Sequence, residues 1–347
     1  MTEFPDVFAY DASDSEDDAA HELARVVESL GFDAPFVVCN VHGRRIAARL
    51  RGPRPHDTPP RGANLEWASE LGADARRDGA DAIVAIGGGR CLDVGKLAAA
   101  RAGLTLVAVP TQLSHDGLCS PVAVVPGARG HTDSLGAVAP RAVFLSVPTL
   151  LGAPRASVAA GIGDLLANPL ALRDWALARE RGLDTIHERA WGMSVESFAL
   201  IEPHLDCDLD VAAKDPAFLR RLADALVLSG MAMICAGSSR PASGAEHEIS
   251  HGIDLLFGGR ALHGAQVAFG CVVSTALYGD DTGALRTRLR HLGLPEHPAG
   301  LDLDEDDTVR LLLAAPDTRP GRFTILEEAL LDDAAARALV KRIWGED

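Results

Sequence analysis

The sequence lacks several features that would assign it to a specialised class of protein. Its six cysteines are scattered and form no C-x-x-C pair, so they are expected to be reduced, mostly buried thiols of a cytoplasmic protein. The most apolar helical stretch, residues 222–237, contains Asp224 and falls short of about 20 clean residues, which predicts a core helix and no membrane span. The N-terminus is acidic and has no apolar segment typical of a signal peptide. No internal repeat or low-complexity segment is visible.

Positive charge is scarce as well. The chain has 33 Lys and Arg against 49 Asp and Glu, a formal net charge of −16. This balance argues against nucleic acid or an anionic membrane surface as the main partner. An anionic substrate would need a local cluster of donors that acts against the overall field. A solvated, soluble surface is the simpler explanation of the charge.

Strand-like and helix-like segments alternate through the first 149 residues, which predicts an α/β domain with a parallel sheet covered on both faces. Strands are expected at residues 7–10, 35–39, 82–86, 105–109 and 142–147, and helices at 16–30, 65–77 and from the glycine run through residue 102. Residues 122–125 and 134–138 flank Pro126-Gly127 and are expected to form a hairpin. The prolines of residues 51–62 predict a loop.

Helical patterns follow one another after Pro148. They predict an all-α second domain at residues 150–347, after a first domain at residues 1–149. The expected helices are residues 155–166, 170–181, 190–201, 217–235, 245–256, 264–277, 306–314 and 327–343. Thr324 and Glu327 are spaced as a capping box before the last of them.

Three histidines gather in one stretch, residues 237–263. Ser243 and Glu246 are spaced as a capping box, and a helix there would place His247 and His251 on one face. His263 follows a Gly-Gly turn. Such a set suits a divalent metal, most often zinc, but two histidines beside a polar loop are the commoner case. Residues 247–251 also match H-E-x-x-H, the zinc-protease motif, with Glu248 as its glutamate.

Gly87-Gly88-Gly89 joins a predicted strand to a predicted helix. Backbone N–H groups at such a turn, together with the helix dipole, favour a pyrophosphate, although a tight turn without a ligand is the alternative. The run is not the G-x-G-x-x-G fingerprint. Asp93 and Lys96 follow on the helix, either near the nucleotide or as a solvated pair.

Two further segments carry polar residues where chemistry is expected. Residues 110–121 follow the next strand, and ligands of open α/β sheets sit beyond the carboxyl ends of strands, although a plain polar turn is the alternative. Asp164 interrupts an apolar helical run, and burying an unpaired carboxylate is costly unless a metal or another partner compensates. An N-terminal helix cap would also explain Asp164.

Taken in order, these segments resemble a known family. The pattern is Gly-Gly-Gly-x-x-x-Asp-x-x-Lys (87–96), Pro-Thr-x-x-Ser-His-Asp-Gly-x-x-Ser-Pro (110–121), Gly-x-Gly-Asp-x-x-x-Asn (161–168), Ser-Ser-Arg-Pro-Ala-Ser-Gly-x-Glu-His-x-x-Ser-His (238–251), Leu-His-Gly (262–264) and Gly-Arg-Phe-Thr-Ile-Leu-Glu (321–327). It resembles the sn-glycerol-1-phosphate dehydrogenase family, within the superfamily of iron-containing alcohol dehydrogenases, glycerol dehydrogenases and 3-dehydroquinate synthases.

The resemblance implies a Rossmann-like N-terminal domain, an all-helical C-terminal domain and a cleft between them. It implies that Asp164, His247 and His263 bind Zn²⁺ or another divalent metal, and that Asp116, Asp164 and His251 face the substrate. The residues that would contact NAD(H) or NADP(H) are Gly88, Gly89, Arg90, Cys91, Leu92, Asp93, Thr111, Gln112, Leu113, Ser114 and Ser120. Under this hypothesis Glu248 is incidental and the protease interpretation falls away.

The resemblance therefore implies a zinc-dependent, NAD(P)H-linked reduction of dihydroxyacetone phosphate to sn-glycerol 1-phosphate. His251 is the expected proton donor, with Asp116 and Asp164 beside the reacting group. Arg240 is a candidate for the substrate phosphate because a guanidinium matches phosphate bidentately, but a structural arginine is an equal alternative. Arg44 and Arg45 favour a 2′-phosphate cofactor or lie on a solvated face.

Other functions stay open at this stage. They are a metal-dependent dehydrogenase for another small ketone or polyol, phosphonylated or unphosphorylated, and a dehydroquinate-synthase-like cyclase without net cofactor turnover. Assembly into a homo-oligomer is compatible with the sequence.

Overall fold

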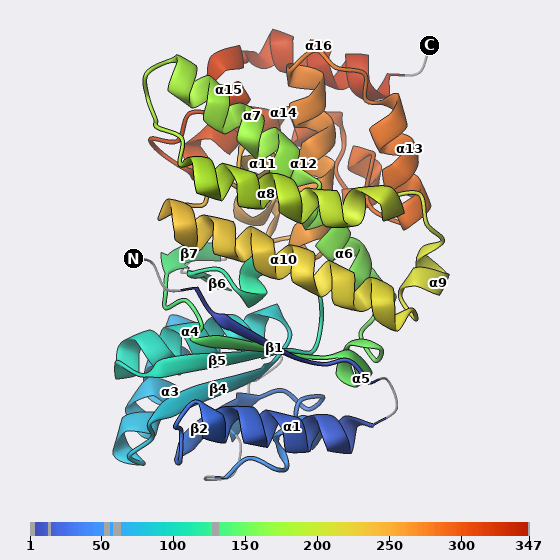
Figure 1. The fold of residues 1–347 in the computed structure, drawn as a ribbon. Coiled ribbons are helices and arrows are strands. Elements are labelled where there is room, and N and C mark those ends of the chain that lie inside the picture. Colours follow the sequence, from blue (N-terminus) through green and yellow to red (C-terminus); the bar gives the residue numbers. More distant parts are fainter. Residues whose placement is uncertain (1–3, 13–14, 52–55, 58–63, 127–131, 346–347) are drawn as a thin grey trace.

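The computed structural model describes residues 4–12, 15–51, 56–57, 64–126 and 132–345. Its N-terminal part is built on a parallel sheet, seen in the lower half of Figure 1. The strand order is β1-β8-β5-β4-β2-β3. The strands are β1 (Asp6–Tyr10), β2 (Pro35–Cys39), β3 (His56–Asp57), β4 (Ala82–Gly87), β5 (Thr105–Pro110) and β8 (Ala142–Ser146). The predicted α/β sheet is thus confirmed.

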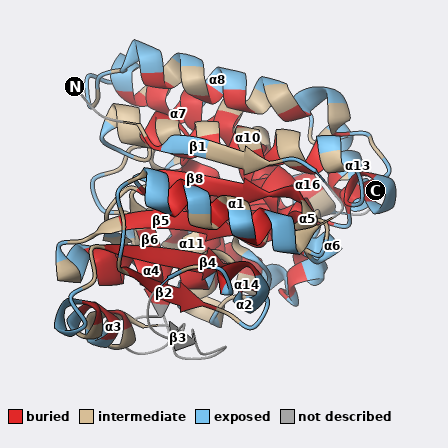
Figure 2. Cartoon of the chain, turned by 60° about the horizontal axis from the view of Figure 1, so that its bottom comes forward, coloured by how far each residue is buried: buried red, intermediate tan, exposed pale blue. Residues whose placement is uncertain are grey.

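Alternate strand residues enter two separate cores, because successive side chains of a strand point to opposite faces. Val84, Ile86 and Phe144 pack under α1 (Glu16–Ser29) and α2 (Arg44–Ala47). Ile83, Ala85 and Leu145 join the larger core on the side of α3 (Leu65–Arg77) and α4 (Gly89–Ala102). Figure 2 shows the central strands buried and the outer surface of α1 exposed. Burial on both faces explains why these strands are continuous apolar runs.

A hairpin lies between the sheet and the helical part of the chain (Figure 1). Its strands are β6 (Val122–Pro126) and β7 (Thr132–Gly136), which pair antiparallel, and it follows the short 3-10 helix η1 (Asp116–Leu118). The hairpin was predicted, but its turn lies outside the described residues. Strand β6 packs on α4, and β7 contacts the helical part.

The rest of the described chain is helical, as predicted. Its helices are α5 (Val147–Leu150), α6 (Arg155–Leu165), α7 (Ala167–Glu180), α8 (Glu188–Ile201), α9 (Leu209–Ala212), α10 (Pro216–Ala236), α11 (Ala245–Phe257), α12 (His263–Leu277), α13 (Gly283–Leu292), α14 (Glu305–Ala314), α15 (Ile325–Ala329) and α16 (Asp333–Trp344). Three 3-10 segments, η3 (Glu202–His204), η4 (Pro298–Leu301) and η5 (Ala315–Thr318), join some of them. The predicted domain boundary at 149/150 falls inside α5 and stays a prediction.

Several local predictions were wrong. The single helix expected at residues 327–343 is two helices, α15 and α16, because Leu330 adopts a left-handed conformation between them. The Ser243–Glu246 capping box does not form: α11 starts after Gly244 with no side-chain cap, and the Glu246 carboxylate turns back to the Gly244 N–H. The Thr324–Glu327 capping box is confirmed. Much of the predicted proline loop at residues 51–62 lies outside the described residues, and β3 falls within that range.

The left-handed conformation of Leu330 makes a stability prediction. Leu330 has φ 47° and is 85% exposed, so its side chain gains little from packing while its backbone is strained. We expect Leu330→Gly to raise the free energy of unfolding by up to about 1 kcal/mol, measured by urea denaturation. The matched control is Leu313→Gly inside α14, which should lower the free energy of unfolding by about 1 kcal/mol. Destabilisation of similar size by both changes would contradict the assignment of strain.

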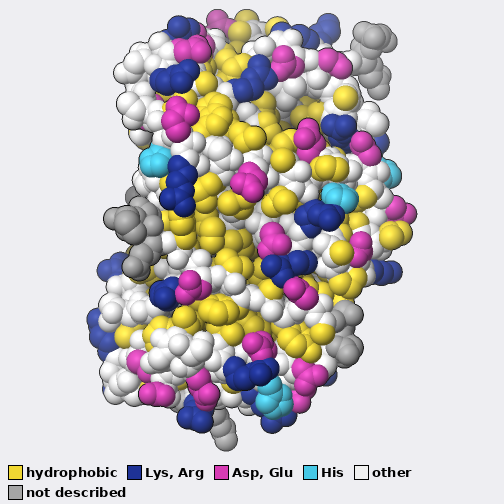
Figure 3. Space-filling view, in the orientation of Figure 1, with side chains coloured by type: hydrophobic (Ala, Val, Ile, Leu, Met, Phe, Trp, Pro, Cys, Tyr) yellow, Lys and Arg dark blue, Asp and Glu magenta, His cyan; other side chains and the backbone are white. Residues whose placement is uncertain are grey.

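The surface mixes charges of both signs. Basic and acidic side chains are interspersed over the face shown in Figure 3, in keeping with exposed pairs such as Arg220–Asp11 and Arg288–Asp206. Within the described residues, none of the helices is both long and apolar enough to span a membrane.

Candidate active site

A pocket of about 730 Å³ opens where the carboxyl ends of β4 and β5 face the helical part of the chain. Its wall on the sheet side comes from Gly88, Gly89 and the segment from Gln112 to Ser120. Its wall on the helical side comes from His247, His251 and His263, with residues around them. The predicted cleft is therefore present.

Three predicted metal ligands from three helices converge beside this pocket. Asp164 lies near the end of α6, His247 in the first turn of α11 and His263 at the start of α12. The Asp164 Oδ1 atom is 3.7 Å from His247 Nε2 and 3.8 Å from His263 Nε2. One donor atom from each residue lies within 4.8 Å of the others. Asp164 is inside its helix, so the helix-cap alternative is wrong.

Glycines permit this convergence, because α6 and α12 pack backbone to backbone. A Cβ atom on Gly163 would overlap the Gly264 carbonyl oxygen, and one on Gly264 would overlap the Ala160 carbonyl oxygen. Similarly, a Cβ atom on Gly270 would overlap the backbone of Glu246, where α12 crosses α11. The small residues around Asp164 and His263 therefore bring the three donors within reach of one another.

Hydrogen bonds orient both imidazoles toward the carboxylate. His247 Nδ1 is 3.0 Å from Glu246 Oε1, and His263 Nδ1 is 3.3 Å from Ser250 Oγ. With Nδ1 engaged, the Nε2 atom of each ring is left to face Asp164. Such an outer hydrogen bond typically fixes the tautomer of a metal-bound histidine.

The electrostatics of the cluster also fit a cation. Asp164 Oδ2 accepts a hydrogen bond from the Asp116 N–H at 2.8 Å, whereas buried Oδ1 has no hydrogen-bond partner among the described residues. Burial, and then the charge of Asp116, raise the pKa of Asp164 well above its usual value. Burial lowers the pKa of His263 to about 4 and that of His247 well below its usual value, which favours the neutral form that a metal ligand requires. One carboxylate and two neutral imidazoles are a suitable donor set for zinc or a similar divalent ion.

The glycine turn supplies the second part of the site. Gly88 is the N-cap of α4, so the first N–H groups of that helix point toward the pocket. A Cβ atom on Gly89 would overlap the His115 ring, and one on Gly88 would come within 3.0 Å of Gln112 Oε1. The turn is thus closed to side chains, and its backbone is left to contact a ligand.

Asp93 and Lys96 are not the solvated pair that was one alternative. Both are buried, with Lys96 Nζ 3.2 Å from Asp93 Oδ1 and 2.7 Å from the Val122 carbonyl oxygen. Lys96 Nζ also donates to the Gly117 carbonyl oxygen. This lysine therefore ties α4 to the polar segment and to β6.

Most of the predicted cofactor residues line the pocket, and a few lie behind it. Those that line it are Gly88, Gly89, Arg90, Cys91, Asp93, Gln112, Ser114 and Ser120. Those outside the lining are Leu92, Thr111 and Leu113, all of them buried. Leu92 and Leu113 belong to the main hydrophobic core.

Asp116 and His251 both line the pocket, as the predicted substrate residues should. Asp116 Oδ2 accepts a hydrogen bond from Ser229 Oγ at 2.9 Å, and burial raises the pKa of Asp116 to about 6. Burial, followed by the positive charge of Arg319, lowers the pKa of His251 well below its usual value. The centre of the His251 ring is 6.1 Å from that of His263.

Arg240 does not line the pocket. Its Nε donates to Asp184 Oδ2 at 2.7 Å and its Nη1 donates to the Phe323 carbonyl oxygen at 2.8 Å, and the residue is only 6% exposed. These contacts favour the structural role that was the alternative for Arg240. Arg44 and Arg90 line the pocket on the side of the sheet, and beside the histidines it is lined by Arg319, which the sequence analysis missed. It lies just before the block at residues 321–327, which was noted without a role.

Glu248 lies away from the pocket. Its carboxylate is fully buried and accepts a hydrogen bond from Thr324 Oγ1 at 3.1 Å. The first metal-protease requirement, a glutamate that faces a water beside the metal, is therefore not met. His251, the second histidine of the H-E-x-x-H match, is also not one of the three residues, Asp164, His247 and His263, whose donor atoms converge.

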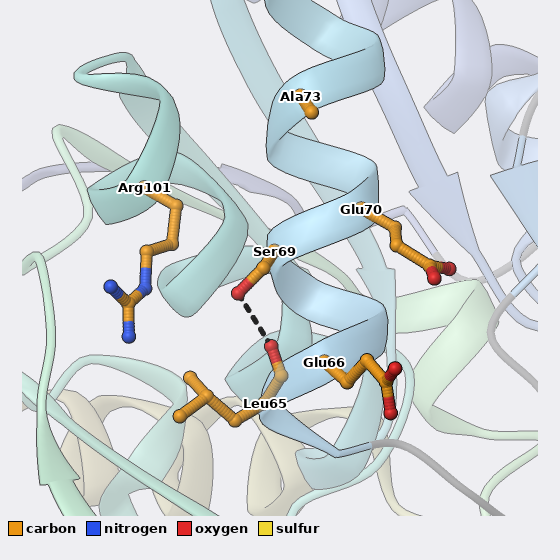
Figure 4. Close-up of a pocket in the computed structure, with 6 residues that line it drawn as sticks. All are labelled: Leu65, Glu66, Ser69, Glu70, Ala73 and Arg101. Carbon is orange, nitrogen blue, oxygen red and sulfur yellow. Dashed lines mark hydrogen bonds between the residues drawn. The ribbon is translucent and has the colours of Figure 1, made fainter.

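A second concavity, along α3, does not bring together side chains suited to catalysis or to metal binding. It is an open groove lined by Leu65, Glu66, Ser69, Glu70, Ala73 and Arg101 (Figure 4). The Ser69 hydroxyl donates to the Leu65 carbonyl oxygen at 2.7 Å, and the carboxylates of Glu66 and Glu70 lie on the side of α3 away from Arg101. Polar groups do not converge there.

Comparison with known proteins gives consistent results. Residues 15–154 match the family model described as iron-containing alcohol dehydrogenase. A protein of Methanoculleus marisnigri named glycerol-1-phosphate dehydrogenase [NAD(P)+] is 34% identical over 95% of this chain and 92% of its own length. One of the same name from Cenarchaeum symbiosum is 37% identical over 77% of this chain and 73% of its own length.

Solved structures show the same fold. A probable glycerol dehydrogenase from Sinorhizobium meliloti superposes with a TM-score of 0.80 at 22% identity, over 98% of this chain and 96% of that one. Sulfoacetaldehyde reductase from Bifidobacterium kashiwanohense, solved with NAD+, superposes with a TM-score of 0.74 at 15% identity over the full length of both chains.

Proposed function

Because the chain belongs to the glycerol-1-phosphate dehydrogenase family of the iron-containing alcohol dehydrogenases, we propose that it reduces dihydroxyacetone phosphate to sn-glycerol 1-phosphate with NADH or NADPH. In this reaction the C2 carbonyl carbon receives a hydride, its oxygen receives a proton, and the reduced nicotinamide is oxidised. The chain is thus a nicotinamide-dependent dehydrogenase whose substrate is a small phosphorylated ketone.

The convergence of Asp164, His247 and His263 beside the pocket is the observation that carries this proposal. These residues would hold Zn²⁺ or a similar divalent ion, which when bound supplies Lewis-acid polarisation of a substrate oxygen. The unpartnered Oδ1 of Asp164 and the two Nε2 atoms that face it support that assignment. Glu246 and Ser250 would hold the two rings in place through their Nδ1 atoms.

The nicotinamide nucleotide would lie along the glycine turn. The N–H groups at the start of α4 would bind its pyrophosphate, because a helix N-terminus favours an anion. The bound cofactor supplies the hydride. Gln112, Ser114 and Ser120 line the same wall and would fix its position relative to the metal residues.

His251 would provide the proton, directly or through a water molecule. It lines the pocket next to His263 but lies outside the metal cluster, so its ring is available to the substrate. Asp116 would help to orient the substrate hydroxyl groups. Ser229 donates a hydrogen bond to the Asp116 carboxylate, and the Asp116 N–H donates one to Asp164. Asp116 would therefore link the position of the substrate to that of a metal ligand.

The test is a steady-state assay in which oxidation of NADH and of NADPH is followed with a panel of three-carbon ketones and their phosphates. We expect dihydroxyacetone phosphate to give the highest kcat/KM and sn-glycerol 1-phosphate to be the product on chiral analysis. Dialysis against a chelator should abolish turnover, and added Zn²⁺ should restore it. Turnover of another ketone with higher kcat/KM would contradict the substrate assignment.

The same assay separates the main rival, a cyclase like dehydroquinate synthase. Such an enzyme uses its nicotinamide transiently and gives no net oxidation of NADH. Net oxidation in proportion to the ketone consumed would exclude it.

A further inference from the structure

We propose that Arg319, together with Ser239 and Ser243, forms the phosphate-binding end of the pocket and selects a phosphorylated substrate. This inference rests on the proposed function for the identity of the ketone. It replaces Arg240 as the candidate for the substrate phosphate.

Arg319 faces the same space as the histidines. It follows η5, whereas Ser239 and Ser243 precede α11, and all three line the pocket together with His247 and His251. Because Arg319 and His251 line the same pocket, a substrate in contact with His251 can extend toward this guanidinium.

The hydrogen bonds of Arg319 leave one edge of its guanidinium open. Nη1 donates to Ser239 Oγ at 3.2 Å and to Ser243 Oγ at 2.7 Å. Within the described residues, no acceptor is engaged by Nε or Nη2. These two nitrogens form the planar fork that binds two oxygens of a phosphate or carboxylate side by side. The serines hold the opposite edge and so fix the orientation of the fork.

The serines add further donors. Ser239 Oγ also accepts from Arg322 Nη2 at 3.0 Å, and Arg322 Nη1 donates to the Ser243 carbonyl oxygen. Because both hydroxyl oxygens accept hydrogen bonds from arginine, their own hydrogens are free to donate to an anion. Arg322 thus acts behind the pocket, where it holds the segment that carries both serines.

The charge balance distinguishes these arginines from Arg240. Arg240 is neutralised by its ion pair with Asp184. Neither Arg319 nor Arg322 forms an ion pair with a carboxylate in the part of the chain that the structure describes. The nearby carboxylates of Glu246 and Glu248 act on both arginines only without direct contact, so burying the two cations is costly, and a bound phosphate would offset that cost. The protein has a net charge of −16, so an anionic substrate needs local hydrogen-bond donors that act against this overall charge. Arg319 and Arg322 supply positive charge of this kind.

The test compares dihydroxyacetone phosphate with dihydroxyacetone, which has the same carbonyl and no phosphate. We expect Arg319→Gln to lower kcat/KM for dihydroxyacetone phosphate by about 100-fold or more, chiefly through KM. The value for dihydroxyacetone should change much less, since that ketone does not contact the guanidinium and responds only to the effect of the lost charge on His251. Arg310→Gln removes an equal charge from the exposed face of α14 and should leave both values unchanged.

Inorganic phosphate provides a probe that does not depend on the ketone. Phosphate should inhibit the unaltered enzyme competitively against dihydroxyacetone phosphate, and calorimetry should show its binding lost in Arg319→Gln. If the protein reduces dihydroxyacetone phosphate and Arg319→Gln keeps its kcat/KM, the subsite assignment is overturned while the proposed function stands. If dihydroxyacetone phosphate is not a substrate but phosphate binding still depends on Arg319, the subsite stands and the proposed function fails.

A folding defect would not obscure the result. Should Arg319→Gln unfold, Arg319→Lys retains the charge but loses the fork, and it should raise KM for dihydroxyacetone phosphate about tenfold. Phosphate inhibition of the unaltered enzyme is independent of any variant, and its absence at concentrations well above the substrate KM would refute the subsite.

Discussion

His263→Ala should remove the bound metal and the activity together. His263 supplies one of the three donors around Asp164, and its Nε2 is 3.8 Å from Asp164 Oδ1. In this variant only Asp164 and His247 would remain to bind the divalent ion, and no other side chain that the structure describes takes the place of His263 in the convergent set. Because Lewis-acid stabilisation is worth several kcal/mol in the transition state, kcat/KM should fall by about 1,000-fold or more. Metal content is measured by mass spectrometry on protein purified without a tag, and activity on the same sample.

The matched control is His21→Ala on the exposed surface of α1, which should keep both metal and activity. Calorimetric titration of the stripped proteins with Zn²⁺ adds a readout that does not depend on turnover. His263→Ala should show at least a tenfold weaker apparent affinity than the His21 variant. Stoichiometric tight zinc in His263→Ala, or full activity without metal, would be incompatible with this ligand set.

The fold was predictable where apolar pattern alone decides it. Residues 82–86 are a continuous apolar run because β4 is buried on both faces, and the helix at 65–77 shows its apolar spacing clearly. Helix α13 was missed because, of its ten residues, only Leu289 and Leu292 are buried. The break at Leu330 was missed as well, although Asp332, which caps α16, was a local signal for it.

The site was predictable in part. His247 and His251 follow from helical spacing, but the contact of His247 with Asp164 depends on the packing of glycines on α6 and α12, which no local pattern describes. Arg240 and Arg319 look alike in the sequence. Only tertiary structure shows that Asp184 neutralises the first and that the second keeps an edge of its guanidinium for the pocket.

Lys96 shows the same limit of local patterns. It was expected beside the nucleotide or in solvent, because a lysine three residues after an aspartate is common on a helix surface. In the structure it is fully buried, and it holds the Gly117 and Val122 carbonyl oxygens together with Asp93. A single amine thus joins the helix after the glycine turn to the segment that carries Asp116. Loss of Lys96 is therefore expected to disturb both stability and the shape of the pocket.

Lys96→Met should lower the free energy of unfolding by about 3–5 kcal/mol, because the Asp93 carboxylate would be left buried without its cation. Urea denaturation measures the change. The exposed Lys341→Met on α16 is the matched control and should stay within about 0.5 kcal/mol of the unaltered protein. Lys96→Met combined with Asp93→Asn should recover part of the loss, since the second change removes the uncompensated charge. A double variant no more stable than Lys96→Met would show that the ion pair is not the cause.

The pH dependence of the Lys96→Met defect gives an independent check. Burial already raises the pKa of Asp93 in the folded protein, and Lys96 opposes that rise. Without Lys96 the folded-state pKa rises further, so the folded variant binds a proton that the unfolded chain releases near pH 4. The contribution of Asp93 to stability is then fully present below that pH and declines as pH rises toward the folded-state pKa. The deficit relative to the unaltered protein should therefore be smaller at pH 5 than at pH 8, whereas a deficit due only to lost packing would be equal at both.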